Sequence, residues 1–585
     1  MIFSLINIKK RINLLFKPSY IYIVMLLYVL LVSFVLVKYL HLSGKSISNM
    51  YYGFGELVTS LISTGRYEVC PTVCFHAHRF PFVPLFLYLL SFVSSKLVVL
   101  LFVKNIIVGL SLIYIFKNIL TKNLNYFSLL LILFVLITPQ FILHGFNLDY
   151  EEPYVMIILA LVSYLLLFHQ NSNGQGKTNI ESVVFGFLVI LLFSIKSSLT
   201  YLSLFLPLLY FIRHREMRSL IIQYLLLFLF VILWSSFNYV NSGRFTMSSS
   251  WNGWNLYKGN NQYTLQYYPK YNLDILDQKG MVEAPLNMTN EWELDNYYTV
   301  KAKEFIKKNP AIFIKSAFIK TGTFFFEVRP FGIEWGGKRY DGVLKYFGTF
   351  FMVIQRFLFF LTLAVSLFFL KSKVKELKVL AILFLGFIFF YSAPFLIGFA
   401  YERHYIPLLL PIVLFLIEFR RVILKNGFVV LKNNFSELNS DTVGNDNLIF
   451  LDIDGTVTND GQHFIDDKIL EKIIELTKSN EIYFCSNNNN FERFDKITLA
   501  TGVACLNIPH KKPNVKILKF IKNDRSLPFL VIGDKFLTDG LFAIRIGARF
   551  VMVRRLRSND DSFLVKVIYL FDDVVFYLVK NIWLI

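Results

Sequence analysis

Two aspartates that follow one apolar segment are the residues in this sequence best suited to phosphate chemistry. The apolar run 448–451 predicts a strand buried on both faces, and Asp452 and Asp454 come directly after it. A Gly-Thr pair follows and predicts a turn, in which two carboxylates spaced this way can converge. One carboxylate can attack phosphorus while the other handles the leaving-group proton, and both can lie near a divalent cation. An ordinary strand-to-helix turn is the alternative, since Asp, Gly and Thr are common turn residues.

Other groups needed for phosphoryl transfer follow in the same region, each at or near the end of a predicted strand. Two further apolar strands are predicted at 482–485 and 529–532. The groups beside them are a hydroxyl, an amide, an amine and two carboxylates: Ser486, Asn487, Lys512, Asp534 and Asp539. Parallel strands of an open α/β sheet bring such groups to one edge, where ligands bind. The sequence therefore predicts a site with a nucleophile, an acid/base, a cation and metal carboxylates.

The order and spacing of these motifs resemble those of the haloacid dehalogenase (HAD) phosphatases. The runs SNN…R…KKP and GDxxxTDG are most similar to the class IIIA, YqeG-like branch, which includes phosphatidylglycerophosphate phosphatases. The resemblance covers roughly 447–557 and implies a small Rossmann-like α/β domain without a cap. It also implies Mg²⁺-dependent hydrolysis of a phosphate monoester.

The resemblance assigns a role to each motif residue. Asp452 would be the nucleophile and Asp454 the general acid/base, while Ser486 and Lys512 would hold the transferring phosphoryl group and Asn487 would contact the substrate. Mg²⁺ would be held by acidic residues, with the Asp454 carbonyl among the ligands: Asp452, Asp454, Asp534 and Asp539. Lys535 departs from the family pattern, in which this position is more often neutral, and a cation there could weaken metal binding.

The phosphatase-like segment is the C-terminal part of a 585-residue chain that is 55% hydrophobic and 17% charged. Soluble domains are typically about 45–50% apolar and about 25% charged. The excess lies in apolar runs long enough to span a bilayer, which predict a polytopic α-helical membrane domain at 1–425. The polar segment 426–446 is predicted to be a linker to the α/β domain.

The predicted spans alternate with short basic loops. They lie near 20–40, 96–116, 125–145, 153–169, 181–197, 198–212, 219–240, 345–370, 378–398 and 404–420, whereas the apolar segment 81–95 is short for a span. Basic residues flank the first and the last span: Lys9, Lys10, Arg11, Lys17, Arg420, Arg421 and Lys425. They predict that both termini and the α/β domain lie in the cytoplasm, and the chain is expected in the inner cell membrane. These loops also account for the net charge of +20 without a nucleic-acid partner.

Two long segments, 41–80 and 241–310, then fall outside. Cys70 and Cys74 lie in the first of them, where a disulfide is expected to persist. A metal site that includes His76 and His78 is the alternative reading of the same pattern. Glu56 opens a short amphipathic helix in this segment, and Glu152 stands at the outer end of a span. Carboxylates at a membrane boundary are costly unless they are solvated or functional, so these two residues are candidates for a functional site. For Glu56, the alternative is a structural role as a helix-capping residue in the loop.

The succession of these motifs resembles GT-C glycosyltransferases of the protein-mannosyltransferase and aminoarabinose-transferase type, over roughly 20–420. It implies transfer of a sugar from a polyprenyl-phosphate-linked donor to an acceptor at the outer face. The resemblance implies that Glu56 and Glu152 are catalytic, although the position of Glu56 is commonly Asp in these enzymes. A divalent metal ion is possible in this glycosyltransferase site. Cations and an aromatic residue would bind the donor: Arg403, Arg79, Lys196 and Trp254. Trp254 can equally anchor the chain at the membrane interface.

Two accounts of the whole chain remain open. The first is a bifunctional membrane enzyme, with glycosyl transfer outside and phosphate-ester hydrolysis inside. The alternative is a transporter or flippase for a lipid-linked sugar, with the HAD-like domain as a phosphate-binding regulator. Transporters usually place ionisable residues at mid-membrane, whereas the acids here lie at the outer boundary, which favours the enzyme.

The segment 558–585 is predicted to be an amphipathic C-terminal helix. It is apolar except for a stripe in which Lys566, Asp573 and Lys580 recur every seven residues. This pattern is typical of a helix that lies in a membrane interface, with Trp583 as an anchor, and it predicts a phosphorylated substrate carried by a membrane lipid. Packing of the helix on the domain's own sheet is the alternative.

Overall fold

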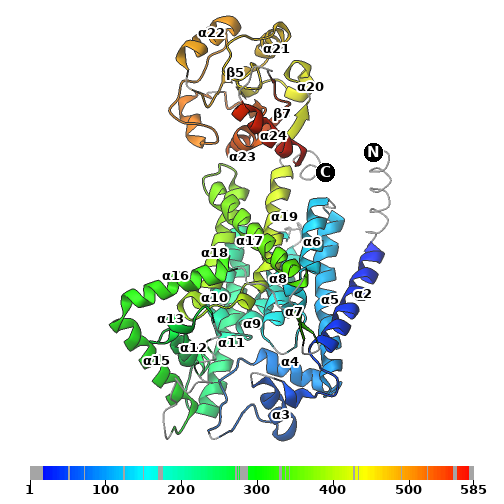
Figure 1. The fold of residues 1–585 in the computed structure, drawn as a ribbon, viewed down its shortest axis with the longest axis vertical. Coiled ribbons are helices and arrows are strands. Elements are labelled where there is room, and N and C mark those ends of the chain that lie inside the picture. The colour runs from blue at the N-terminus through cyan, green and yellow to red at the C-terminus, as the bar shows by residue number, and fades with distance from the viewer. Residues whose placement is uncertain are drawn as a thin grey trace. The chain divides into compact units, whose positions relative to one another are not determined.

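The chain forms two compact units in a computed structural model (Figure 1). The helical unit comprises Met1–Leu124, Ser128–Thr362 and Leu383–Phe415, and the α/β unit comprises Asn125–Phe127, Leu363–Ile382 and Leu416–Ile585. The structure describes the following residues: 18–50, 53–71, 73–122, 126–148, 150–168, 175–270, 273, 276, 288–327, 333–335, 338–340, 343–425, 429–432, 434–488, 490–523, 525–557 and 563–578. The basic residues predicted to orient the N-terminus, together with Asp149, Lys580 and Trp583, lie outside these ranges.

Among the described residues, five helices are long and apolar enough to cross a membrane. They are α2 (Pro18–Tyr39), α5 (Leu97–Lys122), α11 (Met217–Ser242), α17 (Val343–Phe369) and α18 (Lys375–Ile397). Shorter helices occupy the other predicted spans: α8 (Glu152–Phe168), α9 (Gln175–Phe193), α10 (Thr200–His214) and α19 (Leu409–Lys425). Many apolar side chains of the long helices α2, α5, α11 and α17 are exposed, as expected for helices whose surroundings are lipid.

The predicted span 125–145 is two helices rather than one. The helices α6 (Tyr126–Ile137) and α7 (Pro139–Gly145) meet at a bend of 61°. Pro139 has no backbone N–H to continue α6, and Thr138 before it is extended, so the chain restarts as a new helix with the proline in its first turn. If this pair counts as one span, the number of candidate spans among the described residues rises to six.

The segments predicted to lie outside contain η1 (Ile47–Asn49), α3 (Phe54–Thr64), α12 (Asn252–Gly259), α13 (Thr264–Tyr267) and α15 (Glu291–Lys308). The helices α4 (Phe82–Ser91) and α16 (Pro310–Phe326) follow them in the chain. Glu291 joins the two segments, because its buried carboxylate accepts hydrogen bonds from the backbone N–H groups of His76 and Ala77 and from the Ser250 hydroxyl. A ten-residue helix rises about 15 Å, so α4 is too short to cross a bilayer, as predicted.

The α/β unit is built on one parallel sheet. Its strands are β3 (Val429–Lys432), β4 (Leu448–Leu451), β5 (Glu481–Phe484), β6 (Phe529–Gly533) and β7 (Arg549–Val553), in the order β3-β7-β6-β4-β5. Strands β4, β5 and β6 are those predicted from the sequence. The strand β3 lies in the segment predicted to be a linker, and the segment thus contributes an edge strand. The first predicted strand, β4, lies between β5 and β6, so its carboxyl end marks a topological switch point.

Helices cover both faces of this sheet because the apolar side chains of its strands point alternately to either side. On one face, Ile449, Leu451 and Ile532 belong to a core with α21 (Asp467–Thr477) and α22 (Phe491–Thr501). On the other face, Phe450 and Val531 belong to a core with α23 (Leu541–Ile546). The described residues between β4 and α21 contain no further helix or strand. The remaining elements are η5 (Phe435–Glu437), α20 (Ser440–Val443), η6 (Val515–Phe520), η7 (Phe536–Gly540) and α24 (Phe563–Leu578).

A candidate active site at the strand ends

Lys512 is the centre of a buried charge cluster at the carboxyl ends of β4 and β6. Its ammonium group lies 2.6 Å from Asp452 Oδ1 and also contacts Asp539 Oδ1, and all three side chains are buried. Burial opposes the charge on Lys512, but the two carboxylates outweigh it and raise the pKa of the lysine. A permanent cation is therefore held beside the first aspartate of the DxD motif.

Asn487 positions the backbone of Lys512. Its side-chain oxygen accepts a hydrogen bond from the Lys512 N–H at 2.6 Å, and its amide nitrogen donates to the Lys512 carbonyl at 3.2 Å. Sequence reasoning assigned Asn487 to the substrate, whereas here both ends of its amide bind the chain. These two hydrogen bonds fix the backbone of Lys512, from which its side chain extends. Asn487 therefore helps to hold the Lys512 ammonium group in position.

Three carboxylates beside Lys512 form a set that can hold a metal ion. Asp452, Asp534 and Asp539 each offer one oxygen, and these oxygens all lie within 4.8 Å of one another. Neither carboxylate oxygen of Asp534 has a hydrogen-bond partner within the described part of the chain, although Oδ2 lies 3.3 Å from Arg555 Nη1. Buried carboxylate oxygens without donors are costly unless a cation faces them. Oxygen ligands are those that Mg²⁺ prefers, so the donor set fits this ion.

Burial makes the negative charge of this set hard to maintain in the metal-free protein. It raises the pKa of Asp539 to about 6, with Asp452 adding to the effect, and it raises the pKa of Asp534 as well. Gly455 permits this packing: its φ is +81°, and a Cβ there would come within 2.5 Å of Asp534 Oδ2. The glycine of the DxDGT run is therefore required for the turn and for the close approach of Asp534.

The second aspartate of the motif occupies a different environment. Asp454 accepts hydrogen bonds from the Ser486 hydroxyl at 2.9 Å and from the Gly461 N–H at 3.1 Å, and Arg493 Nη1 lies 2.8 Å from its Oδ1. Burial alone would raise the pKa of Asp454, but these donors and the arginine charge outweigh it and lower the pKa. The Asp454 side chain is not among the three clustered carboxylates.

Arg493 is the site residue to which sequence reasoning gave no role. Its guanidinium is buried and donates to the Gln462 carbonyl at 2.6 Å and to Thr458 Oγ1 at 2.8 Å, in addition to pairing with Asp454. A planar guanidinium with several fixed partners holds a carboxylate in one orientation. The signal was present in the SNN…R pattern, but an arginine on a helix after a strand gives no indication of which acid it will meet.

Two more cations surround Asp534. Arg555 lies next to it and also pairs with Asp460, while the charge of Lys535 is stabilised by Asp534 and Asp452, which outweigh burial and raise the lysine's pKa. Lys535 is the residue that departs from the family pattern. Its attraction to the carboxylates indicates that it competes with a metal ion for the same negative charge.

A second charge cluster lies in the helical unit. Glu151 pairs with Arg79 at 3.3 Å and with Lys196 at 2.9 Å. Glu152 is buried, with Lys196 at 3.0 Å, Arg403 at 3.6 Å and His404 at 3.7 Å. The fold thus brings together residues from four distant segments, including the four predicted residues Glu152, Arg79, Lys196 and Arg403.

Two predicted residues of the outer-face site are not in this cluster. The Glu56 side chain is exposed on α3, and no hydrogen bond or ion pair links it to the cluster among the described residues. Trp254 packs on Tyr298 of α15, with ring centroids 4.5 Å apart, and has Lys258 4.9 Å from its ring. Its ring is thus part of the contact between α12 and α15.

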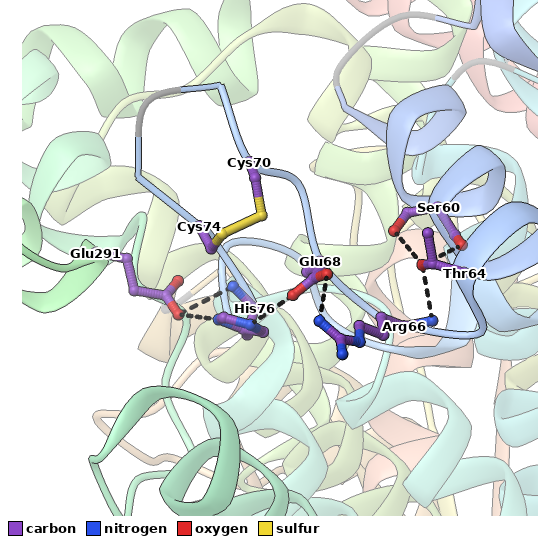
Figure 2. Close-up of a disulfide and its surroundings, with 8 residues drawn as sticks. All are labelled: Ser60, Thr64, Arg66, Glu68, Cys70, Cys74, His76 and Glu291. Atoms are coloured by element: carbon purple, nitrogen blue, oxygen red, sulfur yellow. Dashed lines mark hydrogen bonds and ion pairs between the residues drawn. A yellow bond between two sulfur atoms is a disulfide. The ribbon is translucent and has the colours of Figure 1, made fainter.

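Cys70 and Cys74 form a disulfide, which is one of the two alternatives that the sequence left open for them. Figure 2 shows Cys70 bonded to Cys74, with Glu68, His76 and Glu291 beside them. His76 Nε2 lies 3.2 Å from Glu68 Oε2, and Nδ1 lies 3.7 Å from Glu291 Oε1. The nearby Glu291 carboxylate is the main cause that raises the pKa of His76, and Glu68, which shares a hydrogen bond with Nε2, adds to it. His78 is buried beside Trp251.

The parallel sheet and the charge cluster at its switch point resemble the arrangement that the sequence similarity to HAD phosphatases implies. Residues 428–556 match the family model described as mitochondrial PGP phosphatase. The match begins next to β3, so it includes the strand that sequence reasoning assigned to a linker. It covers the sheet and the strand-end cluster and does not extend to the helical unit. No curated protein and no solved structure matches the chain.

The metal-binding interpretation predicts opposite effects for two neighbouring substitutions. Asp534→Asn removes a ligand charge and should weaken Mn²⁺ binding about tenfold or more, measured by electron paramagnetic resonance on the full chain in detergent. Lys535→Met removes a competing cation and should strengthen binding about fivefold, the effect of one partly screened charge a few ångströms away. Asp495→Asn, at an exposed position on α22, is the matched control. Equal affinities for all variants would contradict the assignment.

Proposed function

We propose that the α/β unit hydrolyses phosphate monoesters with Mg²⁺ as its cofactor, and that Asp452 is the nucleophile. The observation that carries this proposal is the contrast between the two aspartates of the motif. Asp452 lies against Lys512 and the metal-binding carboxylates, whereas Asp454 is held apart by Ser486 and Arg493. Two carboxylates in different environments can take the roles of nucleophile and acid/base. The family match supports phosphatase activity in this domain.

The residues present can carry out hydrolysis in two steps. A carboxylate oxygen of Asp452 attacks phosphorus, the bond from phosphorus to the ester oxygen breaks, and Asp454 gives a proton to the departing alcohol. Asp454 then takes a proton from water, which attacks the phospho-aspartate, releases inorganic phosphate and restores the Asp452 carboxylate. Lys512 would neutralise charge on the phosphoryl oxygens, and the Ser486 hydroxyl, which donates to Asp454 in this structure, would turn to donate to them.

A metal ion held by Asp452, Asp534 and the Asp454 carbonyl would supply charge neutralisation for the phosphoryl group when bound. Asp539 would support it through Lys512 and through the hydrogen bond that its Oδ2 accepts from the Lys535 N–H at 3.3 Å. The proximity of the Asp452, Asp534 and Asp539 oxygens supports these assignments, and the role of the Asp454 carbonyl rests on the sequence resemblance.

We also propose that the substrate is a phosphate monoester carried by a membrane lipid. The matched family is described as a PGP phosphatase, the phosphatidylglycerophosphate activity that the sequence resemblance implied. The chain itself has five helices of membrane-spanning character among its described residues, so the domain is attached to a bilayer. The described loop between β4 and α21 contains no helix or strand that could close over a small soluble ester. We place this domain and both termini on the cytoplasmic side.

Replacement of the nucleophile tests the proposed hydrolysis. Asp452→Asn should lower kcat about 1,000-fold or more on a phosphate monoester, because the amide cannot form the phospho-enzyme. The measurement is phosphate release by the purified full chain with Mg²⁺, with Asp495→Asn as the matched Asp→Asn control. Hydrolysis by Asp452→Asn at the wild-type rate would refute the assignment.

Arg493 should tune the acid/base rather than bind substrate. Arg493→Gln removes the cation that lowers the pKa of Asp454, so that pKa should rise and the limb of the rate–pH profile due to Asp454 should move to higher pH. Because the guanidinium also fixes the orientation of the Asp454 carboxylate, its loss should misalign the acid/base and lower kcat roughly tenfold, with KM little changed. Arg493→Lys should restore part of the profile's position. A loss of kcat with an unmoved profile would mean that Arg493 only supports the fold.

A second proposed function is glycosyl transfer from a polyprenyl-phosphate-linked donor at the outer face, and the cluster around Glu152 is the observation that favours it. Arg79, Lys196 and Arg403 provide cations for a donor phosphate, and Glu151 and Glu152 provide carboxylates beside them. We keep Glu56 as the candidate base, because a base that acts on an incoming acceptor must be accessible.

The outer cluster and the strand-end site should act independently. Glu152→Gln should abolish sugar transfer to an acceptor in membranes while hydrolysis of a phosphate monoester is unchanged, and Asp452→Asn should do the reverse. The measurement is transfer of label from a polyprenyl-phosphate-linked sugar, with protein level as the control. If labelled donor crosses the bilayer without any transfer, and Glu152→Gln stops that movement, the transporter account is correct instead.

A further inference from the structure

The C-terminal helix α24 presents an apolar face to its surroundings. Leu570 is 68% exposed, Tyr577 63% and Phe571 56%, and Val567 and Val574 are exposed beside them. At 3.6 residues per turn, these five positions lie within about 120° of one another. Contiguous exposed apolar side chains of this kind mark an interaction surface rather than scattered surface residues.

The opposite face of α24 holds the helix against the domain. Tyr569 is buried, with the Arg555 guanidinium 4.5 Å from its ring centroid and the Arg557 guanidinium 5.5 Å away. Arg557 also pairs with Asp573 on the same helix. These contacts fix the rotation of α24, so that its apolar face points away from the sheet. The helix thus contacts the domain through Tyr569 and Asp573, while its exposed apolar face remains available to a membrane interface.

Within the same unit, two connections join the domain to apolar helices, α19 and α17, of which α17 is long enough to span a membrane. Only three residues separate the end of α19 at Lys425 from the start of β3 at Val429. The turn after α17 contacts the end of α23: the Arg545 carbonyl accepts hydrogen bonds from the Lys373 N–H at 2.7 Å and from the Ser372 hydroxyl at 3.2 Å, and the Arg545 guanidinium lies 4.4 Å from the Phe368 ring. The α/β domain is thus joined by short connections to helices of the membrane-type segment.

The anchoring contact of α24 is also a contact of the candidate active site. Arg555, which stacks on Tyr569, lies 3.3 Å from Asp534 and pairs with Asp460 in the loop after the DxDGT run. The helix is therefore one side chain away from the carboxylates that would hold the metal. A surface that binds α24 comes close to the place where the phosphoryl group must enter.

We propose that α24 lies in the headgroup region of the bilayer with Val567, Leu570, Phe571, Val574 and Tyr577 inserted, and that this contact presents the strand-end site to phosphate monoesters carried on lipid. The exposed basic residue Arg554, next to Arg555, adds attraction to anionic headgroups. An interfacial helix with an apolar face of this width is held by the burial of that face. The consequence for activity rests on the proposed phosphatase function, whereas the insertion of the helix does not.

Insertion is measured by fluorescence quenching on the full chain in vesicles. A bimane label at Leu570→Cys, in a Cys505→Ala background, should lose about half of its fluorescence to nitroxide-bearing lipids, because it enters the acyl boundary. The matched control is Leu499→Cys, an equally apolar residue that is 89% exposed on α22, which Figure 1 shows well apart from α24 within this unit. It should show little quenching. Equal quenching at both positions, or protection of the Leu570→Cys label by a second copy of the chain, would overturn the proposal.

The consequence for activity is measured with two substrates. Leu570→Asp with Phe571→Asp should lower kcat/KM about tenfold on a phosphate monoester in vesicles, since two large apolar side chains no longer insert. Hydrolysis of soluble para-nitrophenyl phosphate should be unchanged, which shows that the domain is folded. An equal loss on both substrates, or no loss on either, would contradict the inference. If wild-type protein hydrolyses neither substrate, the proposed phosphatase function fails, and the quenching result still decides whether α24 inserts.

Discussion

The repulsion between three buried carboxylates is the constraint on which the strand-end site depends. Asp452, Asp534 and Asp539 lie together at the carboxyl ends of β4 and β6, where water does not screen their charges. Ion pairs with Lys512 offset this cost for Asp452 and Asp539. Asp534 has Arg555 nearby but no hydrogen-bond donor among the described residues, so a metal ion is the partner that it lacks.

Other features of the site follow from the need to hold these charges in place. Asn487 fixes the backbone of Lys512, and Gly455 leaves the space into which Asp534 packs. Arg493 keeps the carboxylate of Asp454 directed to Ser486 and away from the cluster. The two aspartates of one short motif thus have opposite electrostatic surroundings, which is how a single loop can provide both a nucleophile and an acid/base.

Much of the α/β unit could be predicted from the sequence because its signals are local. The apolar runs of β4, β5 and β6 end directly in Asp452, Ser486 and Gly533, and the carboxyl ends of parallel strands meet at one edge of the sheet. The edge strand β3 was missed because four residues in a segment with polar neighbours carry little pattern, and only pairing with β7 defines it. The partner of Arg493 was missed for a related reason: it depends on how a helix is rotated against a loop.

Prediction was less complete for the helical unit. Its apolar runs specified the helices, since length and composition suffice for that. Contacts between residues of distant segments could not be predicted in this way, because they depend on helix packing that no local pattern encodes. The cluster of Arg79, Lys196, Glu152 and Arg403 could be proposed only by resemblance, and the same reasoning placed Glu56 and Trp254 in a site where the structure shows no contact with them in the residues that it describes.

The central claim is that Asp452 carries the phosphoryl group during turnover. The most direct measurement is an acid-quenched single turnover of the full chain with Mg²⁺ and a phosphate monoester, followed by peptide mass spectrometry. The account predicts a phosphorylated aspartate at position 452 that forms and decays within the time of one turnover. Complete release of phosphate without a phosphorylated aspartate, or phosphorylation at Asp454 instead, would contradict it.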